Sequence, residues 1–567
     1  MKIISLFNSR LENALHVVHK FRNRRWFSKD LDTFIASDPQ PKVCILFGVR
    51  RTGKTTGMLQ CIDYMDIDAR KKSVFFQIRT PTKKNGRYIA GDSLWDLQKD
   101  IQEFLDLGYS YFFIDEATNL IDFQQGAEIL SDILALQGAK IVLSGTDSLC
   151  LDDAKRDALL GRSIIIQTTF ISFLEWKYLT SQNDLDLFAK RGGILGDGEQ
   201  IQQLFGSETG CIDYIQSAYA MNMEHSIIER KRSNVPDCIL DLAEEHRFEG
   251  AVQRVVEDLN HRITVKALRK EFSLSAVGSL RELIDQDYRK NQLSNQKKVE
   301  ILQHQKNAFD ALDEKQLIQW MAMCLRIRDE REITKELTID GNAVISDPIV
   351  QYLKRELVRL QVLLPFSILR IQYDGTIVED TKNILIQHGL KYVQAKIMAE
   401  CLLRVPSIAA LTQIESNSLL LRMEQDILGH VVEEIVLVET LKAVQTLDVD
   451  SIIVSTLGLP VGEIDLSLYN RDTRELALFE IKHASTFVKK QAKHLANDNV
   501  IELINIAFDN PKIVRKTVLI NNSSQQPFLD ENGISCMDIS MYLFDIAKNP
   551  LSAFVDPVQK QCKSYNH

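Results

Sequence analysis

The stretch from Lys42 to Thr56, KVCILFGVRRTGKTT, constrains this chain more than any other. The run from Val43 to Phe47 is apolar and partly β-branched, which predicts a buried strand. The pattern G-x-x-x-x-G-K-[ST] follows this strand directly and precedes a helical segment, a context that is typical of a phosphate-binding loop. Its two glycines let backbone N–H groups turn toward phosphate oxygens, beside the positive end of the helix dipole.

The residue types in this loop predict how it would hold a nucleotide. The Lys54 ammonium can reach the β- and γ-phosphates of ATP, and the Thr55 hydroxyl is a ligand for Mg²⁺. A glycine-rich turn without a ligand is the alternative, and the strand and helix around the motif argue against it. The sequence therefore predicts ATP and Mg²⁺ as cofactors, bound by consecutive residues: Gly48, Val49, Arg50, Arg51, Thr52, Gly53, Lys54, Thr55 and Thr56.

A pair of carboxylates follows a second apolar strand. This strand is predicted by the sequence YFFI, and it ends in Asp115 and Glu116, about sixty residues after the loop. A carboxylate at that position can hold Mg²⁺ and its water shell, and the adjacent carboxylate can polarise the attacking water. We therefore expect Asp115 to be a metal ligand and Glu116 to be catalytic, together with Lys54.

The next apolar segment, AKIVLSGTDSL, predicts a further buried strand with polar residues at its end. At the carboxyl edge of a parallel sheet, Thr146 is expected to lie beside the γ-phosphate and to sense it. An ordinary strand-to-loop junction would have the same pattern. Strands that alternate with helices in this way predict a parallel α/β domain with its ligand at that edge.

Four segments, GVRRTGKTT, FFIDEAT, VLSGTDSL and GRSIIIQTTFISFLEW, together resemble the AAA-type P-loop ATPases of the prokaryotic family related to archaeal ATPases. The resemblance covers about residues 40–235 and implies ATP hydrolysis. In families of this kind an arginine can act on the γ-phosphate of a neighbouring subunit, and Arg162 is the candidate by its position. A homo-oligomer is therefore one form of assembly that the resemblance leaves open.

The pattern becomes helical from about residue 236 to residue 350, and residues 350–425 continue helical with short strands. Within this middle region, VKALRKEFSLSAVGSLRELI at residues 265–284 shows two short helical repeats around a Ser-Leu-Ser turn. This segment predicts either a helix-turn-helix, a fold that contacts DNA, or an α-helical lid after the ATPase core.

The last third of the chain carries a second group of charged residues within apolar elements. GHVVEEIVLVETLKA predicts an amphipathic helix that contains Glu433, and LPVGEIDLSLYN predicts a strand with Asp465 at its centre. ELALFEIKHA predicts the next strand, whose period of two places Glu480 and Lys482 on one face. Isolated charges in buried strands are costly unless they are paired or metal-bound, which leaves a metal site and a salt-bridged structural hairpin as the two interpretations.

The metal interpretation gives each of these side chains a role. Asp465 and Glu480 supply oxygen ligands for Mg²⁺ or Mn²⁺. Lys482 orients the attacking water and offsets charge on the phosphate, and Glu433 completes the acidic ring. All four side chains are then expected to be catalytic.

This arrangement resembles the PD-(D/E)xK nuclease superfamily over about residues 425–545, in the variant that is fused to ATPases of the family above. The resemblance implies a C-terminal α/β domain of the restriction-endonuclease type that acts on or binds DNA. The Pro-Asp of the superfamily name is replaced here by Ile464-Asp465. Gln491 and His494, in the helix expected next, are further candidates for positions near the site.

Length and composition limit the number of domains and the classes of protein to which this chain can belong. A chain of 567 residues exceeds the size of one hydrophobic core, and we expect three domains: residues 1–235, 236–424 and 425–567. A net charge of −9 argues against a chain coated throughout by nucleic acid, but it allows a local basic groove. Nine cysteines without a C-x-x-C pair, no secretory signal and no long apolar segment predict a cytoplasmic protein without a membrane partner.

These observations predict an ATP-binding and ATP-hydrolysing AAA-type ATPase coupled to a metal-dependent, nuclease-like module that acts on or binds DNA. The alternative is a nucleotide-switched signalling or scaffold ATPase whose nuclease-like domain is catalytically inactive and only binds a partner. Divalent-metal affinity at Asp465 and Glu480, and stimulation of ATP hydrolysis by DNA, distinguish the two.

Overall fold

The computed structural model describes residues 3–256, 300–307 and 348–558, apart from 81, 85–86, 147–158, 160, 197, 206–207, 228–234, 245–246, 254, 302, 306, 404–405, 525 and 557. The helix-turn-helix predicted at residues 265–284 lies outside these ranges. By its contacts the chain divides into two compact units. The first comprises Met1–Asn183, Gly193–Gln253 and Pro348–Leu363, and the second comprises Asp184–Gly192, Arg254–Asp347 and Leu364–His567. The three domains expected from the sequence stay a prediction.

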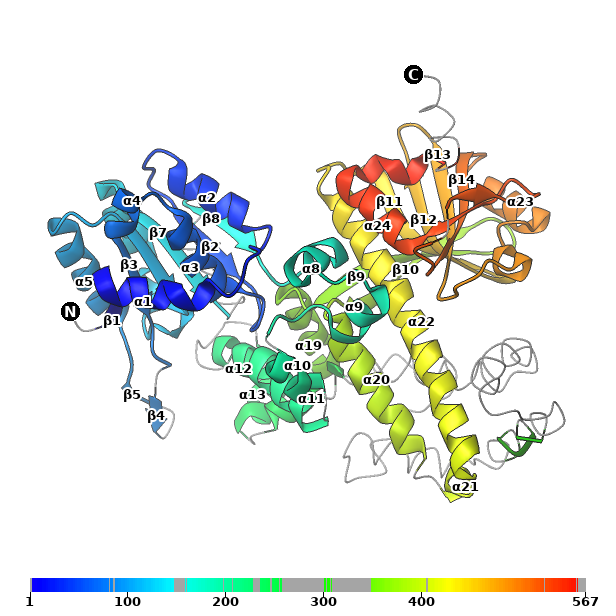
Figure 1. The fold of residues 1–567 in the computed structure, drawn as a ribbon, viewed down its shortest axis with the longest axis horizontal. Coiled ribbons are helices and arrows are strands. Elements are labelled where there is room, and N and C mark those ends of the chain that lie inside the picture. The colour runs from blue at the N-terminus through cyan, green and yellow to red at the C-terminus, as the bar shows by residue number, and fades with distance from the viewer. Residues whose placement is uncertain are drawn as a thin grey trace. The chain divides into compact units, whose positions relative to one another are not determined.

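The first unit contains a six-stranded sheet in the order β1-β3-β6-β7-β2-β8, drawn in blue and cyan in Figure 1. β1 pairs antiparallel with β3, and the other neighbours are parallel. The parallel α/β architecture predicted for the N-terminal part is thereby confirmed. The strands are β1 Ile4–Leu6, β2 Val43–Phe47, β3 Ser73–Gln77, β6 Tyr111–Asp115, β7 Lys140–Gly145 and β8 Ser163–Gln167.

The strand order places β7 between β2 and β6. Leu143 of β7 lies opposite Ile45 of β2 on one side and opposite Ile114 of β6 on the other. Because all three strands are parallel, their carboxyl ends meet at one edge of the sheet. The predicted phosphate-binding loop, Glu116 and Thr146 follow these ends, and Asp115 is the last residue of β6.

Helices cover both faces of this sheet, since they bury apolar residues at helical spacing while the strands alternate. Leu97 and Ile101 of α5 belong to the same core cluster as Ile45 on one face, and Leu31 of α2 and Met58 of α3 belong to the cluster on the opposite face. The α-helices of this unit are α1 Asn8–Val18, α2 Ser28–Ala36, α3 Lys54–Tyr64, α4 Ile67–Lys71, α5 Leu94–Asp106, α6 Phe123–Gly126, α8 Phe173–Thr180, α10 Gly198–Phe205, α11 Glu208–Ile215, α12 Met221–Ile227, α13 Asp237–Glu244 and α19 Pro348–Arg359. Shorter elements are the 3₁₀ helices η1 Ala117–Asn119 and η3 Ala135–Gln137, the π-helices η2 Leu130–Leu134 and η4 Gln216–Ala220, and the hairpin strands β4 Thr82–Lys84 and β5 Arg87–Ala90.

The second unit is built on an eight-stranded mixed sheet in the order β10-β9-β11-β12-β13-β14-β16-β15. β12 pairs antiparallel with both β11 and β13, whereas β14 pairs in parallel with both β13 and β16. The strands are β9 Leu363–Ile371, β10 Ile377–Leu385, β11 Ile452–Leu459, β12 Gly462–Asn470, β13 Glu475–Lys482, β14 Lys512–Ile520, β15 Phe528–Leu529 and β16 Ser535–Asp538.

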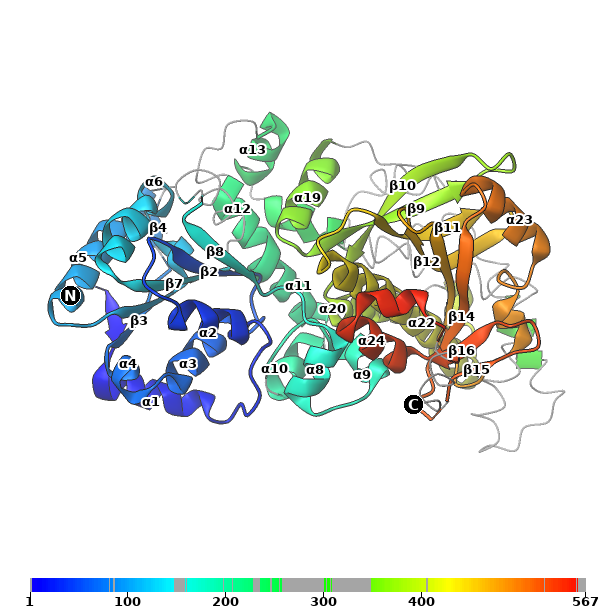
Figure 2. The same cartoon turned by 90° about the horizontal axis from the view of Figure 1, so that it is seen from above.

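Both faces of this sheet are also covered, with α22 and α24 on one face and α23 on the other (Figure 2). Phe479 of β13 packs on Tyr542 of α24, with ring centroids 5.2 Å apart, while the neighbouring Leu478 packs in the cluster that includes Val500 and Ile504 of α23. The helices are α9 Leu185–Arg191, α20 His388–Leu402, α21 Pro406–Ala409, α22 Gln413–Gln445, α23 Asp498–Ala507 and α24 Ile539–Lys548, with the 3₁₀ helices η6 Lys489–Ala492 and η7 Pro550–Phe554.

The structure differs from the sequence interpretation between residues 350 and 425. The sequence pattern predicts helices with short strands there, whereas β9 and β10 are nine residues each and join the sheet of the second unit. β9 pairs in parallel with β11, so Ser367 lies opposite Ser455. A pairing between residues so distant in sequence leaves no local pattern. Among the described residues, no helix has the length and apolar character needed to cross a membrane.

Candidate nucleotide and metal sites

The turn between β2 and α3 has a backbone that requires its two glycines. Gly48 has φ +154°, and a Cβ there would lie 2.4 Å from the Oγ1 atom of Thr168. Gly53 has φ +85° and is the residue that precedes the first turn of α3. Any other residue would be strained at either position, so the shape of the loop explains why the motif has glycine at both.

Lys54 and Thr55 begin α3 and face the end of β6. The buried Lys54 ammonium donates hydrogen bonds to the carbonyls of Gly48, at 2.7 Å, and Val49, at 3.0 Å. Burial lowers the pKa of Lys54 to about 8, against the opposing charges of Glu116 and Asp115. The lysine is therefore held over the loop by groups that a phosphate oxygen can replace as acceptors.

The hydroxyl of Thr55 meets the carboxylate of Asp115. Thr55 Oγ1 donates to Asp115 Oδ2 at 2.9 Å, and the Ser144 hydroxyl donates to the other carboxylate oxygen. Burial, with the charge of Glu116 added, raises the pKa of Asp115. A hydroxyl and a carboxylate at one point form the oxygen donor set that Mg²⁺ prefers, so the residues present fit this ion.

Glu116 and Thr146 lie together at the same edge. Glu116 has a left-handed backbone, with φ +55°, and its Oε2 atom accepts hydrogen bonds from the Thr146 amide at 3.2 Å and hydroxyl at 3.0 Å. The Glu116 amide donates to Ser144 Oγ at 3.2 Å. The structure thus brings together Thr55, Asp115, Glu116 and Thr146, and it adds Ser144, whose hydroxyl contacts the carboxylate of Asp115 and the backbone amide of Glu116.

The remaining loop residues contact the protein through both backbone and side-chain groups. The carbonyl of Arg50 accepts a hydrogen bond from the Tyr214 hydroxyl at 3.0 Å, and the carbonyl of Arg51 accepts one from the Leu195 amide at 2.8 Å. Thr52 is buried, and its hydroxyl donates to the Val49 carbonyl at 2.9 Å. Two further predicted residues do not belong to these contacts. Thr56 is half-buried in the first turn of α3, and Arg162 forms an exposed ion pair with Asp132.

Arg25 contacts the backbone of the loop at Thr52, and no motif in the sequence distinguishes this arginine. Its side chain is buried and donates to Glu175 Oε1 at 2.7 Å, to the Phe170 carbonyl at 2.9 Å and to the Thr52 carbonyl. Arg25 stands in a basic stretch, FRNRRW, whose arginines look alike in sequence. Only tertiary contacts distinguish it from its neighbours.

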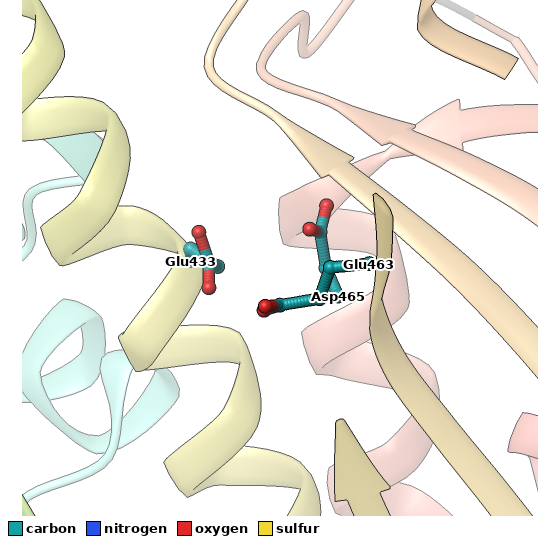
Figure 3. A group of neighbouring side chains, drawn as sticks. All are labelled: Glu433, Glu463 and Asp465. Atoms are coloured by element: carbon teal, nitrogen blue, oxygen red, sulfur yellow. The ribbon is translucent and has the colours of Figure 1, made fainter. Parts of the chain in front are cut away.

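In the second unit, three carboxylates converge between α22 and β12 (Figure 3). One oxygen each of Glu433, Glu463 and Asp465 lies within 4.8 Å of the others, close enough for one metal ion to be a shared partner. Burial opposes ionisation of Glu433, but His430 and Lys382 outweigh it and lower the pKa of this residue to about 2. Burial and the nearby charge of Glu433 raise the pKa of Asp465 to about 7.

Lys482 lies between two of the predicted ligands. Its ammonium is 2.8 Å from Asp465 Oδ2 and 2.6 Å from Glu480 Oε2. Asp465 Oδ2 also accepts a hydrogen bond from the Ile481 amide at 2.7 Å, and Glu480 Oε1 is 3.0 Å from His494 Nδ1. Glu480 therefore lies outside the three-carboxylate cluster and is joined to it through Lys482.

The cluster contains one residue that the sequence interpretation did not select. Glu463 precedes Asp465 by two positions in β12, so the period of a strand places both on one face. The spacing of Glu463 and Asp465 in the sequence could have predicted this pair, whereas the motif selects Glu480 as the second carboxylate. The side-chain oxygen of Gln491 accepts a hydrogen bond from the Val488 amide, so this bond does not join Gln491 to the carboxylates.

Comparison with known proteins supports the N-terminal assignment. Residues 40–177 match the family model of the AAA domain, a range that contains the loop, Asp115, Glu116 and Thr146. The chain thus contains an AAA-type P-loop domain, as predicted. No curated protein matches the chain. Among solved structures it is similar to the S. cerevisiae Hsp104–ADP complex, with 14% identity and a TM-score of 0.26, over 90% of this chain and 66% of that one. That TM-score is too low to establish a shared overall fold.

Proposed function

We propose that this chain binds and hydrolyses ATP in the AAA domain and couples the nucleotide to a metal-dependent, nuclease-like module that acts on DNA. The contact between Thr55 and Asp115, with Glu116 beside it, carries the first half of the proposal. These groups follow the carboxyl ends of β2 and β6 at one edge of the sheet. Together with the loop backbone and Lys54, they match the parts that phosphoryl transfer requires: a phosphate cradle, a cation, a metal-binding pair and a base.

Each residue has a separate task in this reaction. The backbone of the loop and Lys54 hold the β- and γ-phosphates, and Thr55 and Asp115 hold Mg²⁺. When bound, Mg²⁺ neutralises charge on the phosphates. Glu116, fixed by the amide and hydroxyl of Thr146, accepts the proton of the attacking water. Thr146 then links the state of the γ-phosphate to the position of this base.

We expect Lys54→Ala to lower ATP hydrolysis by about 10²–10³-fold, the usual effect of removing one charge-stabilising contact from a transition state. The variant should also bind ATP more weakly, because a buried ammonium above the loop is lost. Phosphate release and nucleotide titration measure the two effects. Lys71→Ala, at an exposed position of α4, is the matched control. Hydrolysis at the wild-type rate in Lys54→Ala would contradict the assignment.

The order of elements around the carboxylate cluster supports the second half of the proposal. A helix that carries Glu433 precedes three antiparallel strands that carry Asp465 and then Glu480 and Lys482, and α23 leads to the parallel β14. We infer from this order that the second unit has a restriction-endonuclease-like domain of the PD-(D/E)xK type, with DNA as its substrate or ligand.

The residues of this cluster suit a phosphodiester substrate. Glu433, Glu463 and Asp465 would hold Mg²⁺ or Mn²⁺, which when bound polarises a phosphate oxygen. Lys482 supplies the positive charge next to the cluster, and it is placed to orient water and to stabilise charge on the phosphate. Glu480 pairs with Lys482, and His494 contacts the other oxygen of the Glu480 carboxylate.

If the three carboxylates bind metal, Mn²⁺ without nucleotide should raise the melting temperature of the wild-type protein. Saturation at about a hundred times the dissociation constant corresponds to about 2.7 kcal/mol. Glu463→Gln should leave the protein equally or more stable without metal, because one of three mutually repelling carboxylates is neutralised, and it should lose most of the Mn²⁺ shift.

Glu502→Gln, at an exposed position of α23, is the control for this experiment. It should keep the full Mn²⁺ shift. An equal shift in the wild type and in Glu463→Gln would show that Mn²⁺ binds elsewhere and would end the case for a metal site at this cluster.

A second function is favoured by the contacts of Lys482, which joins Asp465 and Glu480 in a complete ion network. Such a network can hold a hairpin together for binding alone, as in a nucleotide-switched scaffold or signalling ATPase. DNA that stimulates ATP hydrolysis without being cut in Mn²⁺ would favour this second function. A homo-oligomer, and a role of Arg162 at the γ-phosphate of a neighbouring subunit, are proposals that rest on the family resemblance.

A further inference from the structure

A short helix from the N-terminal half of the sequence belongs to the second unit. The residues on both sides of 184–192 belong to the first unit, whereas this segment packs within the second. It forms α9, whose first turn is capped by Asp184 through a hydrogen bond from the Leu187 amide at 3.0 Å. The helix ends at Arg191 and is followed by Gly192, where a Cβ would lie 2.5 Å from Phe188. Both ends of the segment are thus sharply defined.

Within the second unit, one carboxylate of α9 contacts the end of the strand that carries Glu480 and Lys482. Asp186 Oδ1 is 2.9 Å from Nε2 of His483, the residue that follows Lys482 directly. The same oxygen accepts a hydrogen bond at 2.7 Å from the side chain of Asn521, which follows β14. Asp186 therefore fixes the ends of two neighbouring parallel strands relative to each other.

The other side of α9 is packed against α20. The carbonyl of Gly192 accepts a hydrogen bond from the Gly389 amide at 3.1 Å, and a Cβ at Gly389 would lie 2.8 Å from the backbone of Arg191. Phe188 is fully buried, with its ring 6.0 Å from that of His388. Backbone approach this close leaves α9 little freedom to shift without moving α20 or the strand ends.

Within the first unit, the chain touches the phosphate-binding loop immediately after α9. Gly193 turns the chain with φ +85°, and the Leu195 amide then donates to the Arg51 carbonyl at 2.8 Å. The Leu195 side chain also lies over Gly53, where a Cβ would be 3.3 Å from its Cδ1 atom. Two residues, Gly193 and Ile194, lie between Gly192 and Leu195, and these three steps along the chain reach about 11 Å at most.

We propose that residues 184–195 are a coupling segment through which nucleotide at the loop regulates the nuclease-like site, with Asp186 as the positioning residue. The inference rests on the proposed function at both ends of the segment. Binding of phosphates repositions the loop backbone at Arg51 and Gly53, and Leu195 moves with it. The short covalent link transmits the displacement to α9, and Asp186 passes it to His483 and the strand that carries Lys482.

Hydrogen–deuterium exchange of the full-length protein tests this inference without requiring either enzymatic activity. A nonhydrolysable ATP analogue with Mg²⁺ should slow exchange in residues 48–56 of the wild type. It should also change exchange in residues 476–485 by about fivefold or more, the lower end of measured coupling between sites. Lys54→Ala should lose both responses.

Two variants should separate the coupling from the binding. Asp186→Ala should keep the response of residues 48–56 and lose that of residues 476–485. A Gly-Ser-Gly-Ser insertion between Gly192 and Gly193 leaves every contact of the segment in place and lengthens only the link, so it should have the same effect. Glu502→Gln should retain both responses.

The results distinguish the inference from the function on which it rests. A response at residues 476–485 that persists in both variants, or that is absent in the wild type, overturns the coupling and leaves ATP binding intact. Absence of any response at residues 48–56 in the wild type overturns ATP binding itself, and the coupling with it. Thermal melts identify loss of fold in Asp186→Ala, in which case the insertion variant decides.

Discussion

Glu116→Gln is expected to bind ATP with nearly wild-type affinity and to hydrolyse it about 10²–10⁴-fold more slowly, the range for loss of a general base. The amide keeps the size of the side chain and an oxygen that can accept from Thr146. It cannot take a proton from water. The loss should therefore fall on the rate of hydrolysis, while binding stays the same.

Nucleotide titration and single-turnover phosphate release measure these two quantities separately. Glu128→Gln, at an exposed position of the same unit, is the control and should match the wild type in both. Weak nucleotide binding by Glu116→Gln, with hydrolysis in proportion, would instead make Glu116 a residue that shapes the edge of the sheet.

Lys482→Met is expected to destabilise the second unit by about 3 kcal/mol. The substitution leaves two carboxylates, those of Asp465 and Glu480, buried without their shared cation. Removal of one partner from a buried ion pair costs about 3–5 kcal/mol, and the lower end applies because 32% of the Lys482 side chain is exposed. The melting transition should fall by about 6–12 °C.

Lys489→Met provides the matched comparison. Lys489 also pairs with a carboxylate at 2.6 Å, that of Glu531, but both side chains are exposed. A pair of this kind contributes about 0–1 kcal/mol, so the melting transition should hardly move. Equal melting temperatures for the two variants would show that water solvates the carboxylates around Lys482, and the picture of a buried ion network would be wrong.

The residues that the sequence suggests for the N-terminal site are those whose pattern depends on local order. The loop could be recognised because Gly48, Gly53 and Lys54 act through consecutive backbone positions between a strand and a helix. Asp115 and Glu116 could be recognised because they end an apolar strand. In each case the chemistry and the secondary structure are encoded within about ten neighbouring residues, so no long-range contact is needed to read them.

The parts that escaped prediction depend on contacts between distant residues. β7 lies between β2 and β6, which is why Ser144 reaches Asp115, and no local pattern states a strand order. Glu463 joins Asp465 only because α22 brings Glu433 to the same face of β12. The sequence likewise does not indicate that α9 belongs to the second unit, because the residues on both sides of it belong to the first.

The position of Arg25 determines where this chain can be cut. A recombinant fragment limited to the family match, residues 40–177, would contain every residue of the phosphate-binding loop and lack the cation beneath it. Glu175 would keep its carboxylate in the interior without a partner, and Phe27, against which Gly57 packs, would also be missing. The smallest piece that can serve as an autonomous nucleotide binder therefore begins upstream of Arg25, outside the boundary that family comparison draws.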